Sequence, residues 1–261
     1  MNTRTYQLAG GPVEAAWHGP SPATAPTLVF LHEGLGSVAM WRDFPARLAQ
    51  ATGWGALVYS RYGYGGSAPC ALPRPVRYMH DEALQVLPEL MAAAGIREHA
   101  LVGHSDGGSI ALIHAGGAPQ QGLRGVAVMA PHVFIEDISV ASIAKAGEQF
   151  RTTDLAERLR RYHGGNLDCA FWGWQQAWVS PAFRDWNIES YLAAIAVPLL
   201  ALQGAEDEYG TMLQVAAIVA GAGGPVEAAK LAACGHSPQR DRPEEVLHRL
   251  TRFIAALPPI R

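Results

Sequence analysis

The pentapeptide Gly-His-Ser-Asp-Gly at residues 103–107 limits the folds open to this chain more than any other feature. It follows the apolar run Ala100–Val102 and precedes the segment Gly108–Ile113, which has the composition of a buried helix. A strand that turns sharply into a helix leaves no room for side chains two residues to either side of the turn, which explains both glycines. The residue at the apex takes a strained backbone conformation that projects its side chain into a cleft. Ser105 is therefore a candidate nucleophile.

Short apolar runs bounded by turn residues recur along the chain, separated by segments of helical length. The runs predict strands at 28–31, 56–59, 100–102, 126–129, 199–202 and 226–231. The intervening segments predict helices over 39–52, 77–94, 107–118, 210–221 and 243–256. Pro88 is expected to bend the second helix. Because continuous apolar runs indicate strands buried on both faces, we expect an α/β fold with a mostly parallel sheet flanked by helices. Residues 5–8 and 13–17 predict an antiparallel hairpin at its edge.

The interval 131–198 is far longer than one crossover helix requires. It holds four of the seven tryptophans and an arginine-rich stretch at 151–161. We expect residues 132–197 to form a helical lid inserted into a core of residues 1–131 and 198–261. The lid would lie over the carboxyl ends of the strands, where open α/β sheets bind ligands. The alternative is a second structural layer with no part in binding.

Composition excludes several classes of protein. Hydrophobic residues make up 49% of the chain and charged residues 16%, which suits a compact enzyme and excludes general disorder. A net charge of −3 offers no broadly basic surface, so we expect no nucleic-acid or membrane partner. The first residues lack the apolar core of a signal peptide, and no apolar stretch reaches the ~18 residues that span a bilayer. The three cysteines have no paired spacing, which favours reduced thiols and a cytoplasmic location.

A serine hydroxyl needs a general base, and that base needs a carboxylate that fixes its tautomer. His236 lies in a loop between the predicted strand 226–231 and the last predicted helix, and Asp207 follows the predicted strand 199–202. Both therefore belong to the edge of the sheet that carries Ser105. The 29 residues from Asp207 to His236 hold one helix and one strand, which return the chain to the neighbouring loop. The competing acids are Glu206, Glu208, Glu136 and Asp137, over which position favours Asp207.

The chain resembles the α/β-hydrolase superfamily of serine hydrolases, in the esterase-like branch with a helical cap after the sixth strand. The stretches that carry the resemblance are 31–37, 61–67, 103–107 and the loops of Asp207 and His236, in the order serine, acid, histidine. It implies Ser105 as nucleophile, His236 as base and Asp207 as the orienting acid. The sequence has no zinc-type His or Cys spacing, dinucleotide fingerprint or Walker-type loop, so we expect neither a metal nor a cofactor.

Acyl transfer also needs N–H donors for the developing oxyanion. The backbone N–H of Asp106 is one expected donor, and Gly34, or else Leu35, supplies the other from the loop after strand 28–31. Glu33 stands where the resembled family usually has glycine. We expect Glu33 to pair with Arg61, since a buried carboxylate without a partner is costly. The alternative role for Glu33 is contact with a polar or cationic substrate group, or with a water molecule.

Three further residues are candidates for the substrate pocket. His132 stands at the mouth of the lid, where packing is its favoured role. Trp172 and Trp178 lie within the lid and are candidates to line an apolar acyl pocket. The arginines of the lid suit an anionic leaving group or form a solvated helix face.

The sequence thus predicts a serine hydrolase whose partner is a small or medium carboxylic ester, with thioesters and lactones open to the same machinery. One alternative is hydrolysis of a carbon–carbon bond in a ring-cleavage product. The enzymes of that type which the chain resembles carry tryptophan after the catalytic histidine, where this chain has Ser237. A ligand-binding protein without turnover is a third interpretation, which the intact set of serine, acid and histidine disfavours.

Overall fold

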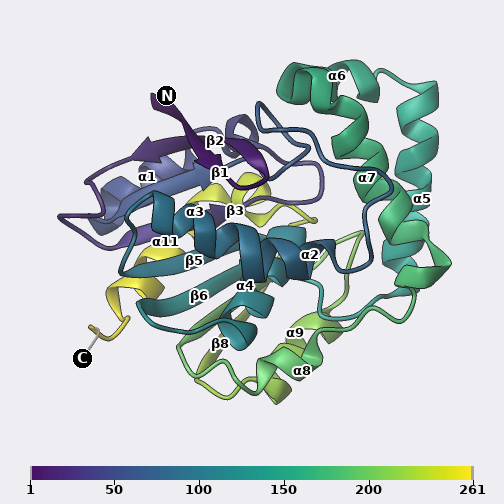
Figure 1. Cartoon of the computed structure of the whole chain (residues 1–261). Coiled ribbons are helices and arrows are strands. Elements are labelled where there is room, and N and C mark those ends of the chain that lie inside the picture. Colours follow the sequence, from purple (N-terminus) through teal and green to yellow (C-terminus); the bar gives the residue numbers. More distant parts are fainter. Residues whose placement is uncertain (1, 260–261) are drawn as a thin grey trace.

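The computed structural model describes residues 2–259 and contains one eight-stranded sheet (Figure 1). The strand order is β1-β2-β4-β3-β5-β6-β7-β8. The strands are β1 (Asn2–Leu8), β2 (Gly11–His18), β3 (Thr27–Leu31), β4 (Gly55–Tyr59), β5 (His99–His104), β6 (Leu123–Met129), β7 (Leu199–Gly204) and β8 (Val226–Leu231). Strands β3 to β8 pair in parallel, whereas β1 and β2 form an antiparallel hairpin and β2 runs antiparallel to β4. The predicted α/β fold is confirmed.

The apolar runs form strands because the sheet is covered on both faces. Along β3, Val29 and Leu31 pack against one hydrophobic cluster, while Leu28 and Phe30 pack against another on the opposite face. All four side chains are fully buried. Successive side chains of a strand point to opposite faces, so a run without polar residues fits only a strand enclosed on both sides.

Helices cover both faces of the sheet. Together with the short η1 (Val38–Trp41), α1 (Phe44–Thr52) and α11 (Pro243–Ala255) pack on one face. On the other face lie α2 (Tyr78–Asp81), η2 (Glu82–Val86), α3 (Leu87–Ala93), α4 (Asp106–Gly117), α8 (Glu189–Leu192) and α9 (Met212–Gly221). The short α10 (Pro238–Asp241) precedes α11. No helix within residues 2–259 is both long and apolar enough to cross a membrane.

The predicted helix over 77–94 is divided at Pro88. The chain forms α2, then the π-helical turn η2, and α3 begins one residue before the proline. Proline has no N–H to donate to the preceding turn, and its ring crowds the carbonyl four residues earlier, so the hydrogen-bonding pattern widens just before it. The expected bend therefore takes the form of a π-turn.

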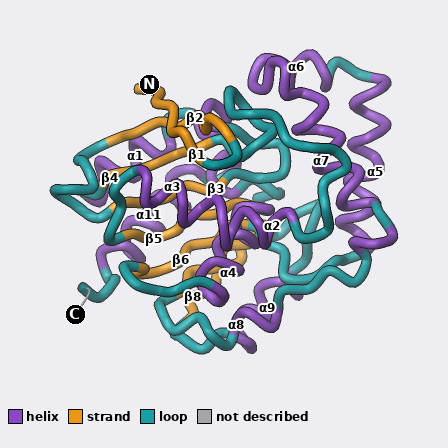
Figure 2. The backbone as a smooth tube through the Cα atoms, in the orientation of Figure 1, coloured by secondary structure: helices purple, strands orange, loops and turns teal. Residues whose placement is uncertain are grey.

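Between β6 and β7 the chain forms three long helices that stand together at one side of the molecule (Figure 2). They are α5 (Asp137–Thr152), α6 (Leu155–His163) and α7 (Leu167–Val179), and we call them the cap. The short turns η3 (Gly164–Asn166) and η4 (Pro181–Phe183) flank α7. Helix α8 belongs elsewhere, because Tyr191 packs on Gly116 of α4 and Leu192 packs on Gly221 of α9. The domain boundaries at 132 and 197 stay predictions.

Candidate active site

The turn from β5 into α4 has the geometry that the pentapeptide predicts. Ser105 has φ 52° and ψ −119°, a conformation that L-residues rarely adopt. A hydrogen bond from its N–H to the carbonyl oxygen of Met129, at 2.9 Å, holds this conformation. A Cβ atom at Gly103 would collide with the carbonyl of Gly107, and one at Gly107 would collide with that of Leu31. Both glycines are therefore required by space.

The structure brings Ser105, His236 and Asp207 together. The Nε2 atom of His236 lies 2.9 Å from the Oγ of Ser105. Its Nδ1 atom lies 2.9 Å from each carboxylate oxygen of Asp207. Because a carboxylate accepts hydrogen bonds, Nδ1 carries the proton and Nε2 is free to accept the serine proton. Three side chains from three separate loops thus form one hydrogen-bonded line.

The surroundings of Asp207 keep its carboxylate ionised. Burial alone would raise the pKa of Asp207, but the hydrogen bond from His236 lowers it below the ordinary value, and the N–H of Tyr209 adds to this. That N–H donates to Oδ1 at 2.8 Å, and the Gln203 side chain donates to Oδ2 at 2.6 Å. An ionised Asp207 can stabilise the imidazolium that forms when His236 takes a proton.

The competing acids lie elsewhere. Glu136 accepts hydrogen bonds from the N–H and the hydroxyl of Thr211, at 2.9 and 2.6 Å, where α9 begins. Asp137 pairs with a surface arginine. Glu206 and Glu208 are both exposed. The geometry therefore favours Asp207 as the orienting acid.

The backbone N–H groups that the sequence predicts as oxyanion donors belong to the two loops next to Ser105. The N–H of Asp106 stands at the first residue of α4, where a helix makes no internal bond to its N–H groups. The loop after β3 supplies the second, and within residues 2–259 no hydrogen bond occupies the N–H of Gly34 or of Leu35. Gly34 and Leu35 therefore both remain candidates for the second N–H donor. The indole of Trp174, from α7 of the cap, packs so closely on Gly34 that a Cβ atom there would collide with it.

The side chain of Asp106 is a feature that sequence reasoning did not find. It is fully buried directly after the nucleophile. It accepts hydrogen bonds from the hydroxyl of Tyr78 at 2.7 Å and from the indole of Trp178 at 3.2 Å, and it pairs with Arg61 at 3.5 Å. A buried carboxylate without partners would be costly, so these three donors compensate the charge of Asp106.

Arg61 also holds the loop after β3. Its guanidinium donates to the backbone carbonyl of Glu33 at 2.9 Å, and its N–H donates to the Nε2 of His32 at 3.1 Å. The prediction that Arg61 pairs with the carboxylate of Glu33 is therefore wrong, because Arg61 takes the backbone oxygen and pairs with Asp106 instead. The signal in the sequence was an acid directly after the nucleophile, which needs a buried cation.

The carboxylate of Glu33 lies against His104 instead. Its Oε2 atom is 3.4 Å from the Nδ1 of His104, and the side chain is 23% exposed. Burial would raise the pKa of Glu33, but His104 lowers it to about 2. The Nε2 of His104 lies 2.6 Å from the carbonyl oxygen of His236. His104 therefore connects the loop of Glu33 with the loop of His236.

Of the candidate pocket residues, His132 and Trp178 lie at the site. The ring of His132 is 5.8 Å from that of His236 and 4.9 Å from that of Trp178. Burial and the neighbouring His236 lower the pKa of His132 to about 3, so it is neutral near pH 7. Trp172 packs within the cap, where the guanidinium of Arg151 lies 4.7 Å from its ring.

Within residues 2–259 no group of three or more His, Cys, Asp or Glu side chains is placed to hold a metal ion. A comparison with protein families identifies the class of protein to which this fold belongs. Residues 28–249 match the alpha/beta hydrolase family, and the chain belongs to that family. The resemblance noted from the sequence is thereby confirmed.

Two curated relatives are 2-succinyl-6-hydroxy-2,4-cyclohexadiene-1-carboxylate synthases. The one from Enterobacter sp. (strain 638) is 29% identical over 168 residues, which cover 64% of this chain and 59% of the relative. The one from Serratia proteamaculans (strain 568) is 30% identical over 139 residues, which cover 53% and 50%. The chain thus matches between half and three fifths of the length of these relatives.

Solved structures share the fold along nearly the whole chain. A hydrolase from Pseudomonas aeruginosa PA01 has a TM-score of 0.76 at 19% identity, covering 98% of this chain and 99% of that one. An esterase from Rhodococcus sp. ECU1013 has a TM-score of 0.76 at 17% identity, covering 99% and 100%. At such low identity the likeness establishes the fold alone.

Proposed function

We propose that this protein hydrolyses carboxylic esters through an acyl-enzyme on Ser105. The observation that carries the proposal is the line from Ser105 through His236 to Asp207, with 2.9 Å at each step. A hydroxyl within hydrogen-bond reach of an oriented imidazole is the arrangement that activates a serine. Membership of the alpha/beta hydrolase family supports the same chemistry.

In the first step, the Oγ of Ser105 attacks the ester carbonyl while His236 takes its proton. The carbonyl oxygen becomes negative and is stabilised by the N–H of Asp106 and by the N–H of Gly34 or Leu35. When the tetrahedral intermediate collapses, His236 gives the proton to the departing alcohol. Water then attacks the acyl-enzyme by the same route, releasing the acid and restoring Ser105. Thioesters and lactones present the same carbonyl to the site.

The curated relatives favour a second candidate. Their names denote the formation of a cyclohexadiene carboxylate, which is a synthase reaction rather than a hydrolysis. In this candidate the hydrogen-bonded Ser105 and His236 would move a proton of the substrate, and no acyl group would be attached to the serine. The two candidates therefore differ in whether a covalent intermediate forms.

A fluorophosphonate probe followed by a panel of p-nitrophenyl esters and thioesters tests the proposal. We expect labelling of the native protein, no labelling of Ser105→Ala, turnover of at least one ester, and an acyl-enzyme mass after rapid quenching. Labelling without turnover or an acyl-enzyme would contradict ester hydrolysis and favour the synthase-type reaction. Absence of labelling would favour the third interpretation, a binding protein.

A further inference from the structure

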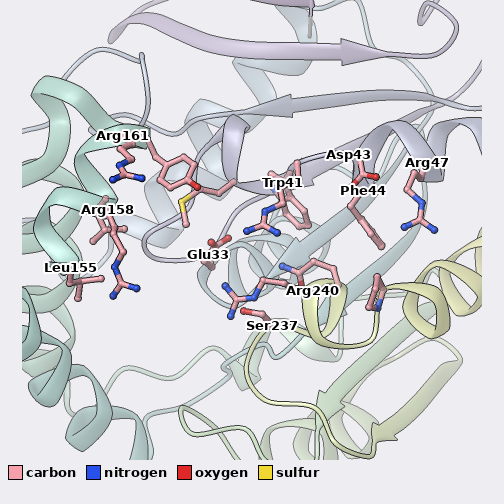
Figure 3. Close-up of a pocket in the computed structure, with 16 residues that line it drawn as sticks. Glu33, Trp41, Asp43, Phe44, Arg47, Leu155, Arg158, Arg161, Ser237 and Arg240 are labelled. Carbon is pink, nitrogen blue, oxygen red and sulfur yellow. The ribbon is translucent and has the colours of Figure 1, made fainter. Parts of the chain in front are cut away.

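A groove of about 570 Å³ lies between the cap and the core (Figure 3). Helix α6 forms one wall, and the start of α1 together with α10 forms the other. Its charged lining consists of five arginines, Arg42, Arg47, Arg158, Arg161 and Arg240, and two carboxylates, Glu33 and Asp43. The chain as a whole carries a net charge of −3, so this groove concentrates positive charge against the general trend.

Most of these arginines have little or no compensation from acidic side chains. Arg47 is the exception, since it donates to both oxygens of Glu244 at 2.7 and 2.8 Å. Arg42 and Arg161 form no ion pair with any residue between 2 and 259.

Arg158 and Arg240 pair only loosely. Arg158 lies 3.3 Å from Asp154 on the exposed surface of α6, and Arg240 lies 3.8 Å from its neighbour Asp241. Ion pairs between such exposed groups contribute little and leave the guanidinium free to bind elsewhere.

The arrangement differs from a solvated helix face. Arg158 and Arg161 are three residues apart on α6, so they share a face, and that face lines the groove. Arg160 is on the same helix but does not line it. Figure 3 shows Arg158 and Arg161 on the cap side of the groove and Arg240 on the other side. Guanidinium groups that gather from both walls repel one another unless an anion lies between them.

One end of the groove, which we call its inner end, is lined by chain neighbours of the proposed catalytic residues, although Ser105, His236 and Asp207 do not line it themselves. Ser237, which lines it, follows His236 directly, and Gln239, which also lines it, lies 3.1 Å from the Nδ1 of His104, the residue before the nucleophile. Glu33, from the loop after β3, also lines the groove, and its carboxylate contacts the same residue, His104. Glu33 places a negative charge near the nucleophile, whereas Arg158 and Arg161 place positive charges on the wall formed by α6. An anion is therefore repelled from the side of Glu33 and attracted to the wall formed by α6.

We propose that this arginine groove binds an anionic group, carboxylate or phosphate, that the substrate carries at a distance from its scissile carbonyl. The inference rests on the proposed function, because it assumes that the reacting carbonyl lies at Ser105. Trp41, Phe44 and Tyr162 also line the groove and supply apolar walls for the part of the substrate that joins the two ends.

Six esters test the proposal. Three share one alcohol and have acyl parts that end in a methyl, a carboxylate or a phosphate group, and three share one acyl group and carry these ends on the alcohol. The measured quantity is kcat/KM for each anionic ester divided by that for its methyl counterpart. We expect this ratio to exceed one in at least one series. The double substitution Arg158→Gln with Arg161→Gln should lower the ratio about tenfold or more, since bonds to charged groups are involved.

Arg160→Gln is the matched control, because it removes the same charge from the same helix without touching the groove, and it should leave the ratio unchanged. A preference for the carboxylate or for the phosphate ester identifies which anion is recognised. A ratio near one in both series, or a ratio that survives the double substitution, overturns the groove proposal while ester hydrolysis stands.

If Ser105 is labelled but none of the six esters is cleaved, the proposed function fails. Anion binding then tests the groove proposal without any turnover. Calorimetric titration with pyrophosphate and with succinate is then the measurement. Binding to the native protein that is lost in the double variant and kept in Arg160→Gln supports the groove. Absence of binding to the native protein overturns it.

Discussion

The turn from β5 into α4, which carries Ser105, differs from the neighbouring arginine groove in the burial and pairing of its polar side chains. At the turn, Ser105 is 6% exposed and Asp106 is fully buried. The hydroxyl of Ser105 is hydrogen-bonded to His236, and the carboxylate of Asp106 accepts hydrogen bonds from Tyr78 and Trp178, which belong to two distant segments. In the groove, the side chain of Arg158 is 60% exposed and pairs with Asp154, which is itself exposed. The proposed reactivity thus depends on buried, mutually supporting contacts, whereas the proposed recognition depends on exposed charges that can change singly.

The largest effect that follows from this comparison concerns Asp207. Asp207→Asn should lower kcat roughly 10⁴-fold, because the amide no longer holds His236 in the reactive tautomer or stabilises its charged form. Glu206→Gln and Glu208→Gln, which remove exposed carboxylates from the same loop, should stay within about twofold of the native rate. Steady-state kinetics on one reactive ester measures all three, and equal losses would show that the loop charge matters rather than the single carboxylate.

The second-largest expected effect is a difference in stability between losing a buried ion pair and losing an exposed one. Arg61→Met leaves Asp106 buried without its cation and should lower the free energy of unfolding by about 3–5 kcal/mol. Arg47→Met removes an ion pair on the rim of the groove and should cost about 1 kcal/mol or less. Denaturant unfolding measures both. If the two variants lost similar stability, the contrast between the two regions would not hold.

The loss of stability at low pH should also come from a buried side chain, that of His132. The pKa of His132 is lowered to about 3, mainly by burial, so the unfolded chain binds more protons than the folded one between about pH 6.5 and pH 3. Stability should therefore fall as the pH drops below about 6.5. His132→Gln should remove on the order of 2 kcal/mol of that loss between pH 7 and pH 4.5. Unfolding at the two pH values gives the difference, and an unchanged loss in the variant would exclude His132 as its source.

The contact between the cap and the oxyanion loop gives a smaller effect. Gly34→Ala should lower kcat/KM about tenfold or more, because the added methyl group collides with the indole of Trp174 and displaces the loop that carries a proposed N–H donor. Adding Trp174→Leu opens that space and should restore part of the loss. Without any restoration by the second substitution, the collision could not be the cause.

The smallest effect concerns salt. Raising the ionic strength from about 0.01 to about 1 M shortens the screening length from roughly 30 to roughly 3 Å, so the advantage of an anionic ester over a neutral one should shrink a few-fold. Hydrolysis of the neutral ester should respond much less, because Ser105 and Asp207 are buried and the neutral ester carries no charge for salt to screen. The ratio of the two kcat/KM values at each salt concentration is the measurement, and a ratio independent of salt would speak against the groove.

The core and the catalytic line could be predicted because each depends on short stretches of sequence. The apolar runs define the strands, and the carboxyl ends of parallel strands place Ser105, Asp207 and His236 at one edge. The contacts of Asp106 could not be predicted in this way. They join Arg61, Tyr78 and Trp178, which come from three distant segments, and their proximity depends on how the cap packs on the core.

The cap tryptophans show what periodicity would have added. Residues two apart on a helix point in nearly opposite directions, whereas residues four apart share a face. Trp174 and Trp178 both face the site, and Trp172 faces Arg151 within the cap. Helical spacing alone would therefore have replaced Trp172 by Trp174 as the companion of Trp178.

The buried acid beside the nucleophile also has a consequence for how this site can be inherited. A relative with an uncharged residue in place of Asp106 has no need of the cation, the phenol and the indole that surround it here. Positions 61, 78, 106 and 178 should therefore change together among descendants of a common ancestor. A lineage that altered one of them alone would pass through a poorly folded or slow intermediate.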